Sequence, residues 1–220
     1  YHASGQPAQD VEEAHYQELV NRVIQGLRGD AAYIVLPENA RFARSFESPE
    51  AVLDFMRTYS EADVVLIDSG TEDADNGFTH VVSTVYDTQD NSYSKQYKEY
   101  LVPTGEYVPS LHTYVLQRVG FGDELARFLE SYNSIPKEND EVYLPRAPGV
   151  LFCFASVSPY RLRTVAANTA VPFVVHVVSH GWFTDPWLLQ HMLDQQMRVN
   201  TLFAHTTVYQ AAHNYTSIRY

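Results

Sequence analysis

The sequence predicts an α+β fold, in which a mostly antiparallel, β-sandwich-like sheet system is flanked by about four helices. Many short segments are rich in β-branched and aromatic residues, which is typical of strands. In the middle of the chain these segments follow one another through turns rather than helices, which favours antiparallel pairing. Hydrophobic residues make up 45% of the 220 residues and charged residues 19%, as in a folded domain with one good core.

Four segments combine apolar residues at helical spacing with helix-start signals. Asp10 is a candidate N-cap for the first, and Ser48-Pro49 is a cap followed by proline at the first helical position of the second. Asp185-Pro186 opens the last segment in the same way. We predict helices over residues 10–27, 48–59, 123–132 and 186–202.

Seven segments have the composition of strands. The run from Val150 to Ala155 is apolar on both faces, which indicates a central strand. Turn residues at 87–92 and 103–105 separate neighbouring segments. We predict strands over residues 32–36, 63–67, 78–86, 97–102, 112–119, 150–157 and 173–179.

We expect residues 1–220 to form a single domain, with residues 1–9 as an N-terminal arm and residues 206–220 as a C-terminal docking segment. The docking segment has little charge and three of the chain's 16 tyrosines, a residue type that suits protein interfaces. Tyr209, Tyr215 and Tyr220 are therefore predicted interface residues, and other protein subunits, identical or different, are the predicted partners.

Composition excludes several classes of protein. The chain has 27 Asp and Glu against 15 Lys and Arg, a net charge of −12, which repels phosphate backbones and argues against a broad nucleic-acid-binding face. Apolar runs are far shorter than the roughly 20 residues of a membrane-spanning helix. The single cysteine rules out an internal disulfide framework and a multi-cysteine zinc site.

One short motif indicates a possible enzyme. The apolar run 64–67 leads into Asp68-Ser69-Gly70-Thr71, and a strand that ends in this way resembles the active-site signature of retropepsin-type aspartic proteases. The resemblance implies a homodimer in which two Asp68 carboxylates share one proton. The alternative, which we favour, is that Asp68, Ser69 and Gly70 simply end a strand in a turn.

No metal or other cofactor is predicted. His180 and His191 are weak candidates for a metal pair, because His180 ends a predicted strand and His191 lies on the next predicted helix. Cys153 lies among apolar residues, where burial keeps a thiol inert, so we expect a core cysteine rather than a nucleophile.

These observations favour a non-enzymatic assembly subunit. The concrete form of this prediction is a virus capsid (coat) protein matured from a precursor and located in the virion, since both ends resemble arms and the sequence begins at Tyr1. The first alternative is the dimeric aspartic protease built on Asp68. The second alternative is an α+β module that binds a small ligand.

Overall fold

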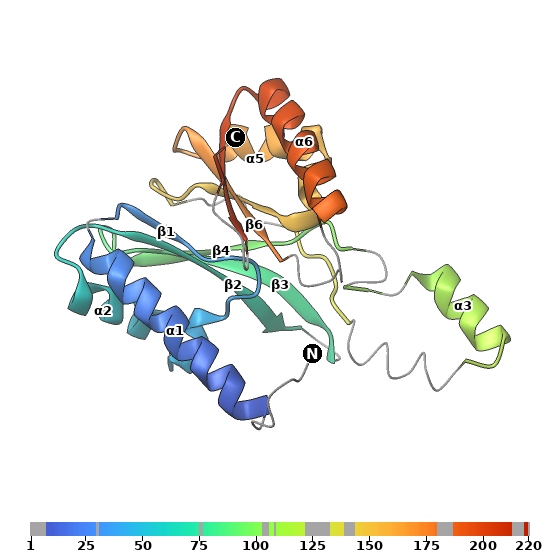
Figure 1. Ribbon diagram of the computed structural model, residues 1–220, viewed down its shortest axis with the longest axis horizontal. Helices are drawn as coiled ribbons and strands as arrows, with labels where there is room; N and C mark the ends of the chain where they lie inside the picture. The colour runs from blue at the N-terminus through green and yellow to red at the C-terminus, as the bar shows by residue number, and fades with distance from the viewer. Residues whose placement is uncertain are drawn as a thin grey trace.

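The computed structural model describes residues 8–29, 31–74, 77–102, 106–107, 109–121, 133–138, 144–179, 187–212 and 218–219. Within these residues, two four-stranded sheets form the centre of the molecule (Figure 1). The first contains, in spatial order, β1 (Tyr33–Val35), β2 (Val65–Asp73), β3 (Thr79–Asp87) and β4 (Ser92–Tyr97). The second contains β5 (Gly149–Phe152), β6 (Phe173–Val178), β7 (Thr207–Ala212) and β8 (Ile218–Arg219).

Helices cover the outer faces of the two sheets (Figure 1). The first sheet packs against α1 (Ala8–Arg28) and α2 (Pro49–Tyr59), and the second against α5 (Pro159–Asn168) and α6 (Trp187–Ala204). Two short 3₁₀ helices, η1 (Phe42–Ser45) and η3 (Cys153–Val157), follow β1 and β5. The helix α3 (Ser110–Arg118) lies away from both sheets.

Side-chain alternation along the strands builds this layered arrangement. On β2, Leu66 points to the core shared with α1 and α2, whereas Val65 and Ile67 point to the core between the sheets. On β6, Val174 points toward α5 and α6, whereas Val175 points inward. The first half of β2 and most of β6 are therefore buried on both faces, which explains why these segments are apolar runs.

The prediction of a mostly antiparallel β-sandwich is wrong, because both sheets are mixed. The pairing is parallel between β1 and β2 and along β5, β6 and β7, and it is antiparallel from β2 to β4 and between β7 and β8. The physical reason is the connection between strands: α2, α5 and α6 each lead from one strand to a parallel neighbour, as parallel pairing requires.

Individual elements differ in how well the sequence predicts them. The helices at 10–27, 48–59 and 186–202 correspond to α1, α2 and α6, and Ser48 caps α2 by accepting the Ala51 N–H at 3.3 Å. The predicted strand 112–119 is wrong: all but its last residue lie in α3, on which the strand-favouring Tyr114 and Val115 are exposed rather than paired in a sheet. The predicted helix 123–132 lies outside the described residues.

Gly149 allows α5 to pack closely on β5. A Cβ atom added at Gly149 would overlap Cγ1 of Val165 on α5. We expect Gly149→Ala to lower the free energy of unfolding by about 1–3 kcal/mol, as overpacking of a close-packed core does. Urea denaturation measures this loss. The double variant Gly149→Ala/Val165→Ala removes the overlapping Val165 side-chain atoms, so it should lose less stability than the sum of the two single variants. A loss equal to that sum would contradict the packing argument.

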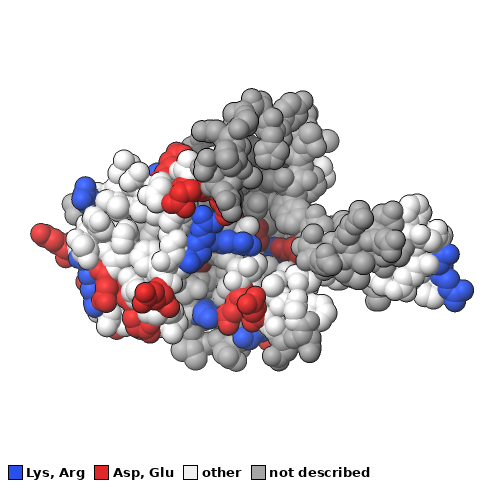
Figure 2. Space-filling model, turned by 90° about the horizontal axis from the view of Figure 1, so that it is seen from below, with Lys and Arg blue, Asp and Glu red and all other residues white. Residues whose placement is uncertain are grey.

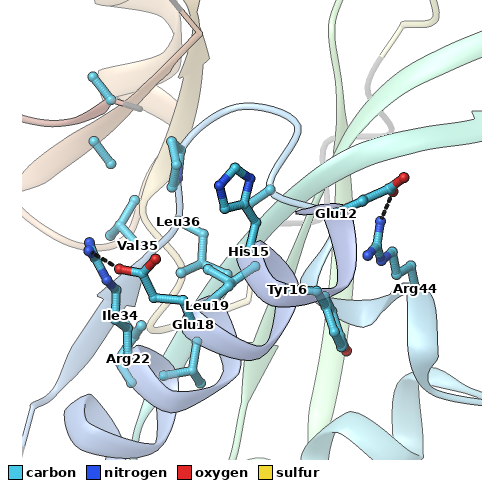
Figure 3. A pocket seen from close by; sticks show the side chains of 15 residues that line it. Glu12, His15, Tyr16, Glu18, Leu19, Arg22, Ile34, Val35, Leu36 and Arg44 are labelled. Atoms are coloured by element: carbon cyan, nitrogen blue, oxygen red, sulfur yellow. Dashed lines mark hydrogen bonds and ion pairs between the residues drawn. The ribbon is translucent and has the colours of Figure 1, made fainter. Parts of the chain in front are cut away.

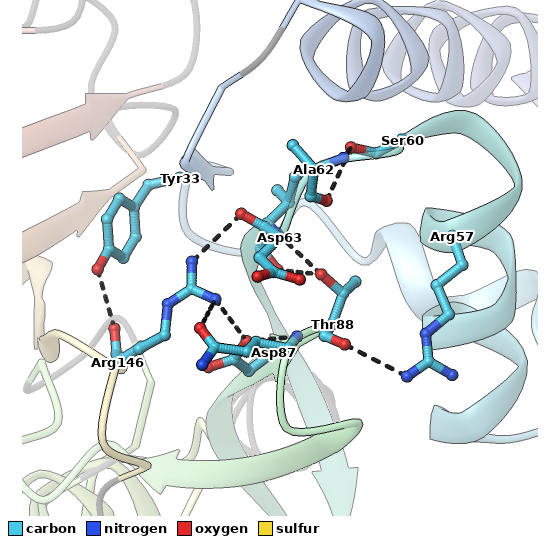
Figure 4. Close-up of polar contacts among 10 residues, drawn as sticks. Tyr33, Arg57, Ser60, Ala62, Asp63, Asp87, Thr88 and Arg146 are labelled. Atoms are coloured by element: carbon cyan, nitrogen blue, oxygen red, sulfur yellow. Dashed lines mark hydrogen bonds and ion pairs between the residues drawn. The ribbon is translucent and has the colours of Figure 1, made fainter.

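Arg146 precedes β5 and contacts the first sheet near the end of β3 (Figure 4). Its guanidinium group donates to Gln89 Oε1 at 2.7 Å and contacts Asp87 Oδ1 at 3.3 Å, while Tyr33 donates to the Arg146 carbonyl oxygen at 3.2 Å. Asp87 itself is fully buried. The segment that precedes β5 is thereby fixed to β1 and to the end of β3.

The surface combines mixed charge with exposed apolar side chains. Acidic and basic side chains are interspersed on the face seen in Figure 2. On α3, Leu111 is 71% exposed and Tyr114 is 56% exposed. Among the described residues, no helix is both long and apolar enough to cross a membrane.

Candidate active site

Three polar side chains lie just beyond the carboxyl ends of strands. Glu38 follows β1, Lys98 follows β4 directly, and Cys153 follows β5 directly. Since β1 and β4 both run in the direction of β2, Glu38 and Lys98 lie toward the same edge of the first sheet. The Lys98 ammonium lies 5.9 Å from the ring centre of Phe152, so the end of β5 faces it from the second sheet.

Lys98 is a buried cation held between two carboxylates. Its ammonium nitrogen lies 2.7 Å from Glu38 Oε1 and 2.6 Å from Glu106 Oε1. The side chains of Lys98, Glu38 and Glu106 are 1%, 7% and 10% exposed, so all three charges are largely removed from water. A buried charge requires partners that replace its hydration, and the two carboxylates provide them.

Burial and charge act in opposition on this cluster. Burial would lower the pKa of Lys98, but the charges of Glu38 and Glu106 and their hydrogen bonds raise it above its ordinary value, so the ammonium stays protonated. Burial raises the pKa of Glu38, Lys98 opposes this, and the charge of Glu106 adds to it. Glu38 is therefore a stronger base than an exposed carboxylate.

Local backbone contacts fix Glu106 against the segment that carries Lys98. Glu106 Oε2 accepts the Val102 N–H at 2.7 Å, and the Glu106 N–H donates to the Val102 carbonyl at 2.9 Å. The carboxylate thus contacts the ammonium of a residue that lies eight positions earlier in the chain.

Cys153 lies beside this cluster as a free, half-buried thiol. Burial raises its pKa to about 12, and the charge of Glu38 acts in the same direction, whereas Lys98 and the Ser179 backbone N–H favour the thiolate. The same Ser179 N–H, which follows β6, also favours ionised Glu38. At neutral pH the thiol is protonated, and Glu38 is the nearby group suited to remove its proton.

A buried polar network holds the turn at Cys153. The Cys153 carbonyl accepts a hydrogen bond from Ser156 Oγ at 2.7 Å and lies 3.3 Å from His176 Nε2, which donates because a carbonyl oxygen only accepts. The other ring nitrogen of His176 contacts Gln210 Oε1 at 3.1 Å, and Asn200 donates to the Ser156 carbonyl at 2.6 Å. These contacts fix the backbone from which the thiol projects.

The residues of the protease-like motif lie elsewhere. Asp68 is not at a strand end: it is paired with Thr84 in the middle of β2 and is 5% exposed. Its two carboxylate oxygens accept the N–H groups of Phe42 at 3.1 Å and Ala43 at 2.9 Å. The expected turn at Asp68 is therefore wrong. Because both carboxylate oxygens accept hydrogen bonds from the same chain, neither is directed toward a second chain.

The remaining predicted residues are only partly within the described structure. Tyr209 lies on β7, is 39% exposed and packs edge-on against Phe173, so its interface role stays a prediction. Tyr215, Tyr220 and His180 lie outside the described residues, and His191 lies on α6 with an exposed side chain. Among the described residues, no three His, Cys, Asp or Glu side chains converge as metal ligands would.

A groove of about 600 Å³ runs along α1 and is separate from the cysteine cluster (Figure 3). Its lining comes mainly from α1 and the segment after it, with Ala211 and Ala212 at the end of β7. Ion pairs join Glu12 to Arg44 and Glu18 to Arg22 among its lining residues. The side chains that could perform covalent chemistry are at the cysteine cluster instead.

Comparison with solved structures identifies the fold. A carbon–nitrogen hydrolase from Helicobacter pylori G27 superposes with a TM-score of 0.63 at 15% identity, covering 91% of this chain and 68% of the other. An amidase of the nitrilase superfamily from Nesterenkonia AN1 superposes with a TM-score of 0.56 at 14% identity, covering 91% and 70%. This chain therefore has the fold of nitrilase-superfamily carbon–nitrogen hydrolases. No protein-family model and no curated protein sequence matches it.

The Nesterenkonia amidase provides a chemical comparison. One of its structures carries the acetamide moiety of fluoroacetamide covalently added at the active-site cysteine, in a variant with glutamine in place of a glutamate. That structure superposes with a TM-score of 0.53 at 14% identity, covering 90% of this chain and 70% of the other.

These findings correct the functional prediction. The virus capsid protein and its virion location are wrong, and the retropepsin-like protease using Asp68 is wrong too, because the chain has the fold of carbon–nitrogen hydrolases. Sequence reasoning missed Glu38, Lys98 and Glu106 and took Cys153 for a core residue. The overlooked signal is that Glu38, Lys98 and Cys153 each come shortly after a strand, where parallel sheets carry their sites.

Proposed function

We propose that this chain hydrolyses the carbon–nitrogen bond of an amide through a covalent intermediate on Cys153. The observation that carries the proposal is the buried Lys98 ammonium, held by Glu38 and Glu106 beside a free thiol. Such a cluster combines a nucleophile, a base with a raised pKa and a fixed positive charge. The covalent chemistry of the Nesterenkonia amidase supports the same role for Cys153.

The first half-reaction forms a thioester. Cys153 Sγ attacks the amide carbonyl carbon while Glu38 accepts the thiol proton, which avoids the need for a standing thiolate. As the tetrahedral intermediate collapses, Glu38 passes that proton to the amide nitrogen, the carbon–nitrogen bond breaks, and ammonia or an amine leaves.

The second half-reaction restores the enzyme. A water molecule attacks the thioester carbonyl while Glu38 accepts its proton. As the carbon–sulfur bond breaks, Glu38 returns that proton to Cys153 Sγ, which releases the carboxylic acid and restores the thiol and the Glu38 carboxylate. Two of the three N–H bonds of Lys98 are directed at Glu38 and Glu106. The third N–H is suited to the negative oxygen that forms in both steps, where a fixed charge costs no reorganisation. Glu106 keeps Lys98 protonated and in place.

Ammonia release from small amides tests the proposal. The full chain is incubated with acetamide and propionamide, and separately with fluoroacetamide followed by intact-protein mass spectrometry. We expect ammonia release above that of Cys153→Ala and a mass increase located at Cys153. The assignment is unambiguous because the chain has one cysteine. Absence of both turnover and adduct in the folded protein would contradict the proposal.

A further inference from the structure

The segment Asp68-Ser69-Gly70 lies against the loop that carries Glu38. Asp68 accepts one backbone N–H on each carboxylate oxygen, from Phe42 at 3.1 Å and from Ala43 at 2.9 Å. These two amides begin η1, whose own N-cap residue, Arg41, makes no side-chain capping hydrogen bond. The carboxylate of Asp68 therefore caps η1 from the neighbouring strand.

The same strand fixes the loop at further points. Before Glu38, the Leu36 N–H donates to the Ile67 carbonyl at 2.9 Å, and after it the Arg41 N–H donates to the Ser69 carbonyl at 2.9 Å. At Gly70, an added Cβ would lie 3.3 Å from Arg41 Cγ, so glycine leaves room for the arginine side chain. Asp68, Ser69 and Gly70 each serve the loop that follows Glu38.

The backbone after Glu38 needs such support. Asn39 and Arg41 have φ angles of 64° and 52°, in the left-handed region that costs a residue with a Cβ about 1 kcal/mol or more. Strained residues of this kind persist only where surrounding contacts hold them. The contacts that do so here come from β2 and from Tyr16 of α1, which donates to the Phe42 carbonyl at 3.0 Å.

We propose that Asp68 is a positioning residue, whose carboxylate holds residues 37–45 in the conformation that presents Glu38 to Lys98 and Cys153. The inference rests on the proposed function, in which Glu38 is the base. It assigns a role to the motif Asp68-Ser69-Gly70, whose residues are not members of the cysteine cluster.

The charge of Asp68 adds a readout that a purely structural role lacks. Burial raises the pKa of Asp68 to about 6, while the N–H groups of Ala43, Phe42 and Ser69 oppose the rise. The titratable group that faces it from β3 is Tyr86, whose pKa is raised by burial and by the charge of Asp68, and to a lesser degree by Glu50 of α2. Protonation near pH 6 removes one of the two accepting oxygens and should loosen the loop.

The sign of the linkage separates this effect from unfolding. The folded-state pKa of Asp68 lies above the unfolded value of about 3.9, so its contribution to stability is fully present below that value and is lost as pH rises through about 6. A loss of reactivity as pH falls through 6 therefore does not come from unfolding driven by Asp68.

The test compares Asp68→Asn with Asp87→Asn, a matched control that changes another buried aspartate at the far end of β3. The alkylation rate of Cys153 by iodoacetamide and the hydrogen exchange of the Phe42 and Ala43 amides are measured on the full chain at pH 7.5. We expect alkylation at least about tenfold slower and amide exchange at least about tenfold faster in Asp68→Asn only. Asp68→Glu, which restores a carboxylate, should recover part of both.

A wild-type measurement covers the case in which Asp68→Asn does not fold. The amide resonances of Phe42 and Ala43 in the wild type should shift with a midpoint near pH 6. Absence of that titration, or a folded Asp68→Asn that matches the wild type in alkylation and exchange, overturns the inference. Failure of the proposed function is seen separately, as a wild-type chain that shows the amide titration but neither turns over amides nor forms the Cys153 adduct.

Discussion

Replacing Lys98 with methionine is expected to lower the free energy of unfolding by about 3–5 kcal/mol at pH 7.5 and to abolish activity. The substitution keeps much of the volume of the side chain but removes the cation between Glu38 and Glu106. Two carboxylates are then buried together without compensation, the situation in which breaking a buried ion pair is most costly. Urea denaturation measures the loss.

The pH dependence of this loss follows from the carboxylates. In the variant, Glu38 loses the cation that opposes the effect of burial on its pKa, so the pKa of Glu38 rises further and Glu38 takes up a proton on folding. The penalty should therefore shrink between pH 7.5 and 5.5, because protonation of a carboxylate becomes easier as the pH falls.

Lys95→Met is the matched control for Lys98→Met. Lys95 lies three residues earlier on β4 and pairs with Glu72 at 2.9 Å, but both side chains are 36% exposed. Exposed ion pairs contribute about 0.2–1 kcal/mol, so this variant should stay close to the wild type in stability and fully active. Equal stability of the two variants would contradict the buried-cluster argument.

The reliable sequence signals were the local ones. The cap at Ser48-Pro49 correctly placed α2. The turn at residues 87–92 lies where β3 leads into its antiparallel neighbour, but the predicted strand 97–102 shares only Tyr97 with β4. The same signal, Ser158-Pro159, opens α5, where Ser158 Oγ accepts the Arg161 N–H at 3.3 Å, but the apolar run before it drew the predicted strand through to residue 157. Because α5 was not predicted, the alternation of strands and helices that is typical of parallel pairing was not recognised.

The candidate cluster could not be read locally, because Glu38, Lys98 and Cys153 are far apart in sequence. Glu38 and Lys98 are 60 residues apart, and only the pairing of β1, β2, β3 and β4 brings them to one edge. Cys153 was predicted to lie within a strand, because its neighbours are apolar. The structure instead ends β5 at Phe152 and begins η3 at Cys153, so the cysteine lies at a strand end and near the charges of Glu38 and Lys98.

Cys153→Ala is expected to reduce amide turnover by a factor on the order of 10⁴–10⁶, because loss of a nucleophile removes the whole covalent route. The measurement is the initial rate of ammonia release from acetamide or propionamide, whichever the wild type turns over. The fold should change little, by about 1 kcal/mol, since one half-buried sulfur is removed while the backbone contacts of Ser156 and His176 to residue 153 persist.

Glu38→Gln provides the complementary arm of this experiment. If Glu38 is the base, its loss should slow turnover while leaving Cys153 present, so that fluoroacetamide still alkylates the thiol, only more slowly. Glu72→Gln, which changes an acid on β2 outside the cluster, should leave both rates unchanged. Turnover that survives in Cys153→Ala would exclude the thioester route. Turnover that survives in Glu38→Gln with an unchanged pH profile would instead show that Glu38 is not the base. The Cys153 thiol, whose pKa is about 12, would then have no proton acceptor in the proposed mechanism.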